Sequence, residues 1–78
     1  MATKVYISPE NYMAYQFIKN LTRFGLIQTA ASVLAVSSAD IREIENFVTD
    51  NDEGSDRRVI KEAIKEARRL RKERSISE

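Results

Sequence analysis

Small and apolar residues in the segment Thr29–Ile44 constrain the fold of this chain more than any other feature. Ala30–Ala31 supplies the small surface that two helices need when they cross through a turn of three or four residues. Val33–Leu34 then closes a first helix over the core, and Ala35–Val36 carries the chain round the turn, with Val36 beneath it. This pattern predicts a helix-turn-helix, a unit that commonly places its second helix in the major groove of DNA.

The second helix of this unit has its own start signal. The hydroxyl of Ser37 can accept a hydrogen bond from an orphan amide of the first turn, and Asp40 adds a negative charge at the positive end of the helix dipole. The apolar residues that follow have the spacing of one buried helical stripe: Ile41, Ile44, Phe47 and Val48. We therefore expect a helix over about residues 37–48 and a helix-turn-helix over about residues 27–48.

Residues 18–46 read IKNLTRFGLIQTAASVLAVSSADIREIEN, which gives a helix, a Gly, a small-residue helix starting with Gln-Thr, an L-small-V-S turn and an I-x-x-I-E-N ending. In this stretch the chain resembles the helix-turn-helix regulators of phage, both the Cro/CI-like group and the CII-like activators. The resemblance implies double-stranded DNA as the partner and a phosphate contact for Gln28. It further implies that four residues face base edges: Ser37, Ser38, Ala39 and Arg42.

The charge of this segment departs from what DNA binding requires. The predicted second helix offers Asp40 and Glu43 against the single cation Arg42, and residues 1–50 hold four Lys and Arg against five Asp and Glu. Carboxylates repel phosphates, whereas Lys and Arg supply much of the affinity of DNA-binding domains. The positive charge for a DNA contact must therefore come from elsewhere in the chain.

A basic amphipathic helix is predicted over residues 56–74, and it carries that charge. Its narrow apolar stripe either packs back on the motif or pairs with its copy in a dimer: Ile60, Ala63, Ile64, Ala67 and Leu70. The last turns of this helix contain the candidate phosphate-binding residues Arg68, Arg69, Arg71, Lys72 and Arg74. Cations at a helix C-terminus also interact favourably with the dipole and keep a small protein soluble, so this run has a structural explanation as well.

The N-terminal half supplies the scaffold. Residues 1–8 are predicted as an arm, in which Lys4–Ile7 forms either a short strand or an extended segment. Ser8 and Pro9 mark a helix start, and Gly25 suits the left-handed residue that ends this helix. Its predicted core stripe is Met13, Phe17, Leu21 and Phe24, broadened by Tyr12, Ala14 and Ile18.

The acidic residues 51–55 are predicted as a turn between the helical core, residues 9–50, and the last helix. A calcium loop is not indicated, because the position of the EF-hand glutamate is taken by Lys61 when Asp50 begins the loop.

Length and composition limit the remaining possibilities for size, chemistry and location. A chain of 78 residues forms one small domain that buries only about 60% of its unfolded surface, and such a marginal core favours oligomerisation. The absence of Cys and His argues against catalysis, metal binding and disulfides, and we expect no cofactor. No apolar run reaches membrane-spanning length and no signal sequence is evident, so we expect a cytoplasmic protein.

The sequence thus predicts an all-α, small four-helix domain with a helix-turn-helix, a short N-terminal extended arm and a long basic C-terminal helix. The leading hypothesis is a homodimeric, sequence-specific transcriptional regulator of phage or plasmid type that reads DNA with helix 37–48. The alternative is a helical protein-binding module, an inhibitor or adaptor of a host protein, that uses the acidic face of Asp40, Glu43 and Glu45. RNA binding through the Arg-rich end is a third interpretation, although no aromatic residue is interleaved with its cations.

Overall fold

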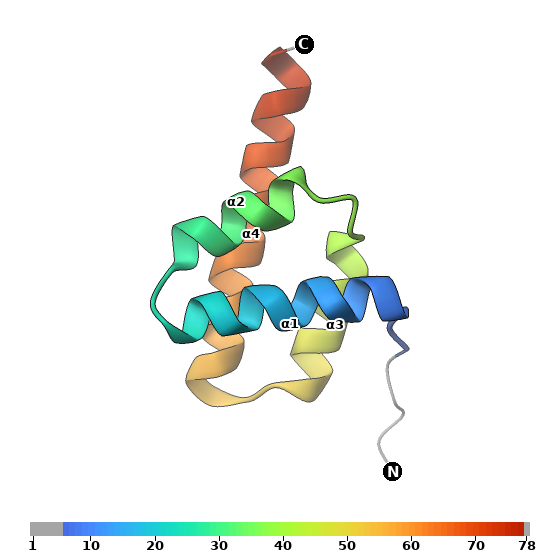
Figure 1. Cartoon of the computed structure of the whole chain (residues 1–78), viewed down its shortest axis with the longest axis vertical. Coiled ribbons are helices and arrows are strands. Elements are labelled where there is room, and N and C mark those ends of the chain that lie inside the picture. Colours follow the sequence, from blue (N-terminus) through green and yellow to red (C-terminus); the bar gives the residue numbers. More distant parts are fainter. Residues whose placement is uncertain (1–5, 78) are drawn as a thin grey trace.

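Four helices make up this computed structural model, which describes residues 6–77 and the side chains of residues 6–74 (Figure 1). The helices are α1 (Pro9–Arg23), α2 (Ile27–Val36), α3 (Ile41–Asn51) and α4 (Gly54–Ser77). No strand occurs within residues 6–77, so the expected all-helical fold is confirmed. Of the predicted N-terminal arm, residues 1–5 lie outside the described residues and residues 6–8 have no regular secondary structure.

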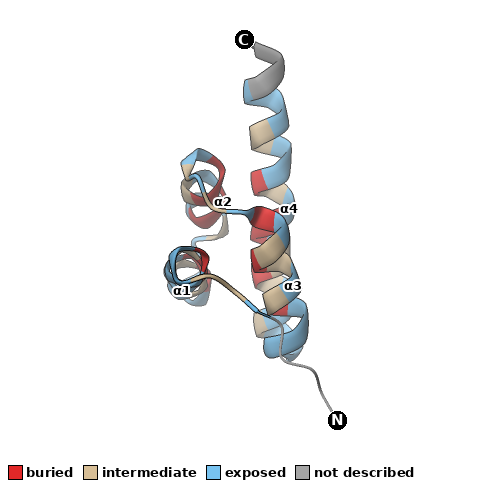
Figure 2. Ribbon diagram, turned by 90° about the vertical axis from the view of Figure 1, so that its right-hand side faces the viewer, coloured by how far each residue is buried: buried red, intermediate tan, exposed pale blue. Residues whose placement is uncertain are grey.

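The helices lie in two layers, with α1 and α2 in one and α3 and α4 in the other (Figure 2). Within the second layer α3 runs antiparallel to α4, and Glu45 Oε1 lies 2.6 Å from Arg68 Nη2. Arg57 Nη1 donates to the carbonyl of Thr49 at 3.1 Å near the other end of the pair. The last turns of α4 extend beyond the other three helices (Figure 1).

The ends of α1 follow the local signals in the sequence. Ser8 is the N-cap and its side chain accepts from the amide of Asn11, while Pro9 takes the first helical position, where its missing amide costs no hydrogen bond. At the other end Gly25 has a φ of +78°, a conformation that favours glycine. The amide of Leu26 then donates to the carbonyl of Leu21 at 3.0 Å, which closes the helix end.

The core lies between the layers, where the apolar stripe of α4 faces the other helices. Four residues of this stripe are at most 1% exposed: Ile60, Ala63, Ile64 and Ala67. They form one cluster with residues of the other three helices, among them Ile18, Leu34 and Ile44. Of the two arrangements left open by the sequence, the stripe therefore packs back on its own chain. The predicted acidic turn at 51–55 is shorter than expected, because α3 ends at Asn51 and α4 begins at Gly54.

The connection between α2 and α3 differs from the prediction. Ala35 and Val36 still belong to α2, Val36 is exposed rather than beneath a turn, and Ser37 caps the C-terminus of α2 instead of starting the next helix. The N-cap of α3 is Asp40, whose Oδ1 accepts from the amides of Arg42 at 3.1 Å and Glu43 at 3.3 Å. The predicted second helix over residues 37–48 is thus α3, shifted toward the C-terminus.

The close crossing of a helix-turn-helix is not confirmed. α2 makes its most extensive contact with α4, and α2 and α3 barely touch each other. Ala30 and Ala31 are completely buried, and small side chains of this kind allow two helix backbones to approach closely. In this fold the small residues of α2 are therefore buried in a helix that packs mainly on α4 and α1, with no close crossing with α3.

The core stripe predicted for α1 is confirmed at Ile18, which is fully buried, and is wrong at its exposed members. Met13, Phe17 and Phe24 are exposed, and Leu21 is only partly buried. The buried face lies on another side of the helix and combines Ile18 with three polar residues, Asn11, Tyr15 and Thr22. The polar members can be buried because each has a hydrogen-bond partner, such as the carbonyl of Lys19, which accepts from Thr22 Oγ1 at 2.9 Å.

Candidate interaction surfaces

The predicted base-reading residues lie around the connection between α2 and α3. Ser37 Oγ donates to the carbonyl of Leu34 at 2.7 Å and accepts from the amide of Ala39 at 3.3 Å, so this hydroxyl shapes the connection. Ser38 is exposed in the same connection, and Ala39 packs against the core cluster. Arg42 is exposed in the first turn of α3. These residues are near one another, but only Arg42 belongs to a helix.

Arg71 is held by the same connection. Its Nε donates to the carbonyl of Ala35 at 3.1 Å, and its Nη2 lies within hydrogen-bond distance of three further carbonyls: Leu34 at 3.1 Å, Ser37 at 2.6 Å and Ala39 at 3.0 Å. Two of these carbonyls belong to the last turn of α2, where helix carbonyls lack intrahelical partners and a cation is favoured by the dipole. The guanidinium therefore fixes the end of α2, a role that the charge run 68–74 did not reveal.

The acidic residues of the predicted protein-binding face also have partners within the chain. Glu43 Oε1 accepts from the amide of Ser8 and from Asn11 Nδ2, both at 2.8 Å. The bond from Asn11, followed by that from Ser8, lowers the pKa of Glu43. Asp40 caps α3, and Glu45 pairs with Arg68 across the second layer. Each of the three carboxylates thus has a structural role.

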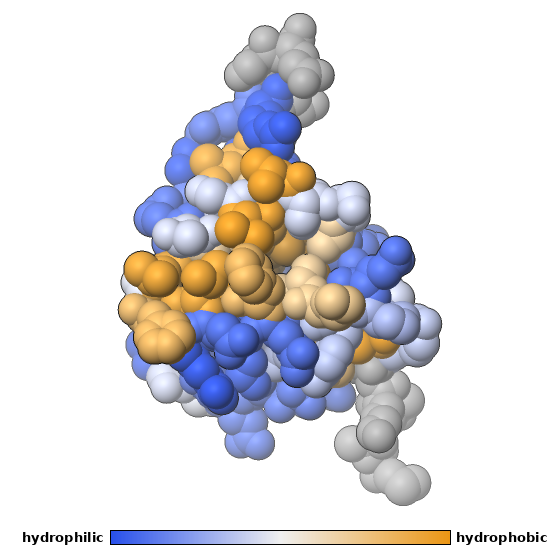
Figure 3. Space-filling view, viewed as in Figure 1, coloured by the Kyte–Doolittle hydropathy of each residue, from blue (hydrophilic) through white to orange (hydrophobic). Residues whose placement is uncertain are grey.

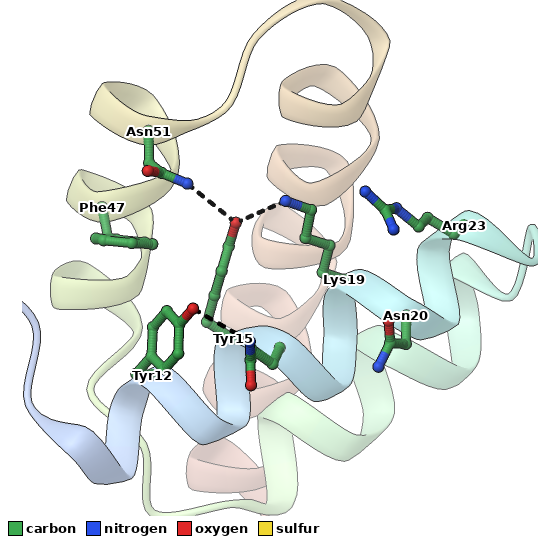
Figure 4. A pocket seen from close by; sticks show the side chains of 8 residues that line it. Tyr12, Tyr15, Lys19, Asn20, Arg23, Phe47 and Asn51 are labelled. Carbon is green, nitrogen blue, oxygen red and sulfur yellow. Dashed lines mark hydrogen bonds between the residues drawn. The ribbon is translucent and has the colours of Figure 1, made fainter.

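A polar cluster in a cleft between α1 and α3 was not predicted (Figure 4). Tyr15 Oη donates to the buried carboxylate of Asp52, 2.8 and 2.9 Å from its oxygens, and Lys19 Nζ donates to Asp52 Oδ1 at 2.9 Å. Figure 4 shows the Tyr15 hydroxyl pointing between Lys19 and Asn51. Burial raises the pKa of Tyr15, and the hydrogen bond to Asp52 raises the pKa of Lys19.

This cluster ties α1 to the end of α3, because Asp52 is the C-cap of that helix. No signal in the local sequence could have found it, since Asp52 lies 37 residues from Tyr15 and 33 residues from Lys19 in the chain. Its hydrogen-bonding groups satisfy one another, and no buried side-chain polar atom among the described residues lacks a partner. The described residues also contain no group of acidic, His or Cys side chains that could hold a metal ion. No helix within residues 6–77 is long and apolar enough to cross a membrane.

A stripe of cations follows one side of α4. Its residues are separated alternately by three and four positions, the spacing of a single helix face: Arg58, Lys61, Lys65, Arg68 and Lys72, which we call the basic stripe. All are exposed except Lys61, which is partly buried. Arg69 lies outside it and is paired with Glu66 at 2.7 Å and with Glu73. Arg68 and Lys72 belong to the C-terminal run of cations predicted from the sequence, whereas the other three lie earlier on the same helix face and were missed because that run begins at residue 68.

The opposite layer presents a surface of another kind. Five large apolar side chains of α1, α2 and their connection are exposed, by 71% at Met13, 53% at Phe17, 81% at Phe24, 46% at Leu26 and 68% at Val36. Figure 3 shows apolar residues gathered over α1 and α2 on this face. We call these five residues the apolar face.

The other two residues predicted to contact DNA lie on different helices. Gln28 is exposed at the start of α2, whereas Arg74 is exposed near the far end of α4, beside the groove between α2 and α4. The predicted DNA-binding residues therefore do not form one continuous surface. No family model, no curated protein and no solved structure matches this chain.

Proposed function

We propose that the chain is a small DNA-binding protein that contacts the phosphate backbone of duplex DNA through the basic stripe of α4. The observation that carries the proposal is the distribution of charge. α4 contains nine of the thirteen Lys and Arg residues against four Asp and Glu, and five of the nine share the side that forms the stripe. A cationic face of this kind is the electrostatic footprint of nucleic-acid binding.

The dimensions of the stripe fit a duplex. From Arg58 to Lys72 the helix rises by about 21 Å at 1.5 Å per residue. One DNA strand carries a phosphate about every 3.4 Å along the axis, so this length faces roughly six phosphates of a strand. The last 25 residues contain no aromatic side chain that could stack on unpaired bases. This favours a duplex backbone over single-stranded nucleic acid as the partner.

The stripe replaces the connection between α2 and α3 as the centre of the proposed contact. Arg68 and Lys72 remain from the residues implied by sequence, and Arg42 can extend the surface, since it lies one turn before Glu45, the partner of Arg68. Backbone contacts of this kind supply affinity without sequence information. A regulator of transcription needs base reading in addition, for which Ser38 and Arg42 are the exposed candidates.

The test measures binding to a labelled random-sequence duplex of about 20 base pairs across a salt series. If five cations meet phosphates, the logarithm of the binding constant should fall with the logarithm of salt concentration with a slope of about −4.5. Arg58→Gln should reduce this slope by about one, whereas Arg23→Gln should leave it unchanged. Both substitutions remove one positive charge from an exposed arginine, but Arg23 lies at the end of α1.

Absence of binding even at low salt would overturn the proposal, as would equal effects of Arg58→Gln and Arg23→Gln. Sequencing of retained duplexes from a random pool then addresses base reading. An enriched site that weakens with Arg42→Ala would support a sequence-specific regulator, and retention without enrichment would limit the function to backbone binding.

A further inference from the structure

The apolar face contains large apolar side chains that the core does not use. Met13 and Phe17 of α1 and its C-cap Phe24 take no part in the buried core, although each is a large apolar side chain and α1 has a complete buried face elsewhere. Contiguous apolar surface of this kind on a small protein marks an interaction site, because its exposure to water is unfavourable. Neither the core nor the basic stripe accounts for it.

The α1–α2 segment that carries the apolar face contains few charges of its own. Residues 11–39 contain no Asp or Glu and only two cations, Lys19 and Arg23, in a chain with 25 charged residues. Lys19 is bonded to Asp52 in the cleft on α1. Depletion of charge with enrichment of Phe and Met is typical of the centre of protein interfaces. Such a surface can meet its own copy without like-charge repulsion and offers little to a strongly charged partner.

The apolar face has exposed side chains at one end of α2 and a groove at the other. Phe24 and Leu26 project at the corner before α2, on either side of Gly25. At the other end of α2 lies a groove between α2 and α4, lined by the apolar side chains of Ala35, Val36 and Leu70 and flanked by Glu73 and Arg74 of α4. Between corner and groove, α2 exposes the small side chains of Thr29 and Ser32, which allow two helices to approach closely.

We propose that the apolar face binds a second copy of this chain, with the two α2 helices antiparallel about a two-fold axis near Ser32. In this arrangement the Phe24 corner of each copy enters the groove beside Val36 of the other. The contact is isologous, so one patch supplies both halves of the interface and the assembly closes at two copies. This inference is independent of DNA binding and goes beyond it, since it concerns the opposite layer of the molecule.

The first test is the mass of the protein in solution without DNA, measured by sedimentation equilibrium over about 1–500 μM. The chain of 9.0 kDa should sediment as a dimer of twice that mass at the upper concentrations. Phe24→Asp and Val36→Asp should each weaken self-association by roughly 30-fold or more, as for loss of an interface anchor. Asn46→Asp introduces the same charge on the exposed side of α3 and should have no effect.

Cross-linking tests the antiparallel pairing itself. The chain has no cysteine, so single-cysteine chains carrying Phe24→Cys and Val36→Cys can be mixed under mild oxidation. The mixture should form disulfide-linked dimers faster than either chain alone.

A protein that is monomeric at every concentration would overturn the proposal, and so would a dimer unaffected by Phe24→Asp. A monomer that instead binds lipid vesicles or an unrelated protein through this face would show that the occupant is not a second copy. The charge of α4 is unchanged in these variants, so their monomeric forms still test DNA binding separately.

Discussion

Arg71 provides the sharpest test of the fold, because sequence and structure give it different roles. As part of the run 68–74 it is a candidate phosphate contact, but its guanidinium donates to carbonyls at the end of α2 and in the following connection. We expect Arg71→Ala to destabilise the protein by freeing the end of α2 from α4. Loss of DNA affinity should be secondary.

The magnitude follows from the hydrogen bonds that the guanidinium can satisfy. The Nη2 group has two hydrogens for three carbonyls, so with Nε the side chain makes about three effective bonds. Bonds from a charged donor contribute about 1.5–3 kcal/mol each, but the carbonyls are only partly buried and water can replace some of them. A loss of about 2–4 kcal/mol results, which corresponds to a Tm lower by roughly 10–20 °C for a chain of this size.

Thermal and urea unfolding followed by circular dichroism measure this loss. Arg71→Lys should recover about half of it, because an ammonium lacks the planar fork of the guanidinium. The control is Lys72→Ala at the neighbouring exposed position, which should change stability by less than about 0.5 kcal/mol. If Arg71→Ala is no more destabilising than Lys72→Ala, and weakens DNA binding more, the role assigned to Arg71 is wrong.

Three further predictions concern α1 and its contacts. Tyr15→Phe should cost about 1–3 kcal/mol in urea unfolding, because the buried carboxylate of Asp52 loses a donor; an unchanged midpoint would contradict this. The raised pKa values of Tyr15 and Lys19 mean that the folded state retains their protons more strongly, so this stability is complete below about pH 10 and is lost as pH rises through the folded pKa values. Urea unfolding at pH 9 and 11 should show this loss, with a smaller difference in Tyr15→Phe. Gly25→Ala should cost about 1 kcal/mol through the positive φ, and no loss would argue against that conformation.

Local signals predicted the helix ends of α1 and the buried stripe of α4 correctly. The prediction of which face of α1 is buried was wrong for most of the apolar stripe, because the buried face is decided by bonds to residues distant in sequence. The face with Met13 and Phe17 is more apolar than the face with Asn11 and Tyr15. The second face is nevertheless buried, because Asn11 bonds to Glu43 and Asp40, and Tyr15 bonds to Asp52. Hydrophobic periodicity contains no information about such bonds.

The predicted boundary between α2 and α3 was wrong for a related reason. Ser37 and Asp40 are both good N-caps, and their separation of three residues gives either of them a plausible helix start. The structure uses Asp40 because Ser37 turns back to the carbonyl of Leu34, and Arg71 then holds the same segment from α4. A contact from 34 residues away thus helps to decide a boundary that appears local.

The candidate surfaces were partly accessible from sequence. Within residues 68–74 all five cations look equivalent, although one bonds to carbonyls, another pairs with two glutamates, and Arg68 and Lys72 belong to the basic stripe. Extending the helical periodicity back to Arg58 would have separated the stripe. The apolar face required the structure, because Met13, Phe17 and Phe24 had been assigned to the core.

The proposed dimer determines how the two DNA-binding surfaces would be presented. The apolar face belongs to the α1–α2 layer and the basic stripe to the α3–α4 layer (Figure 2). A two-fold pairing through the first layer therefore places the two stripes on distant sides of the dimer. Helix-turn-helix dimers instead present both reading helices to one duplex, at half-sites about one turn apart.

We therefore expect the dimer to hold two duplexes rather than to read one palindromic site. Because each stripe meets its own backbone, an immobilised duplex should retain a second, labelled duplex in the presence of the protein. Phe24→Asp should abolish this co-retention while leaving binding to the immobilised duplex in place, since it removes the dimer contact and leaves α4 unchanged. Retention of the second duplex by a monomeric variant, or two stripes engaged on one palindromic duplex, would contradict the outward placement of the stripes.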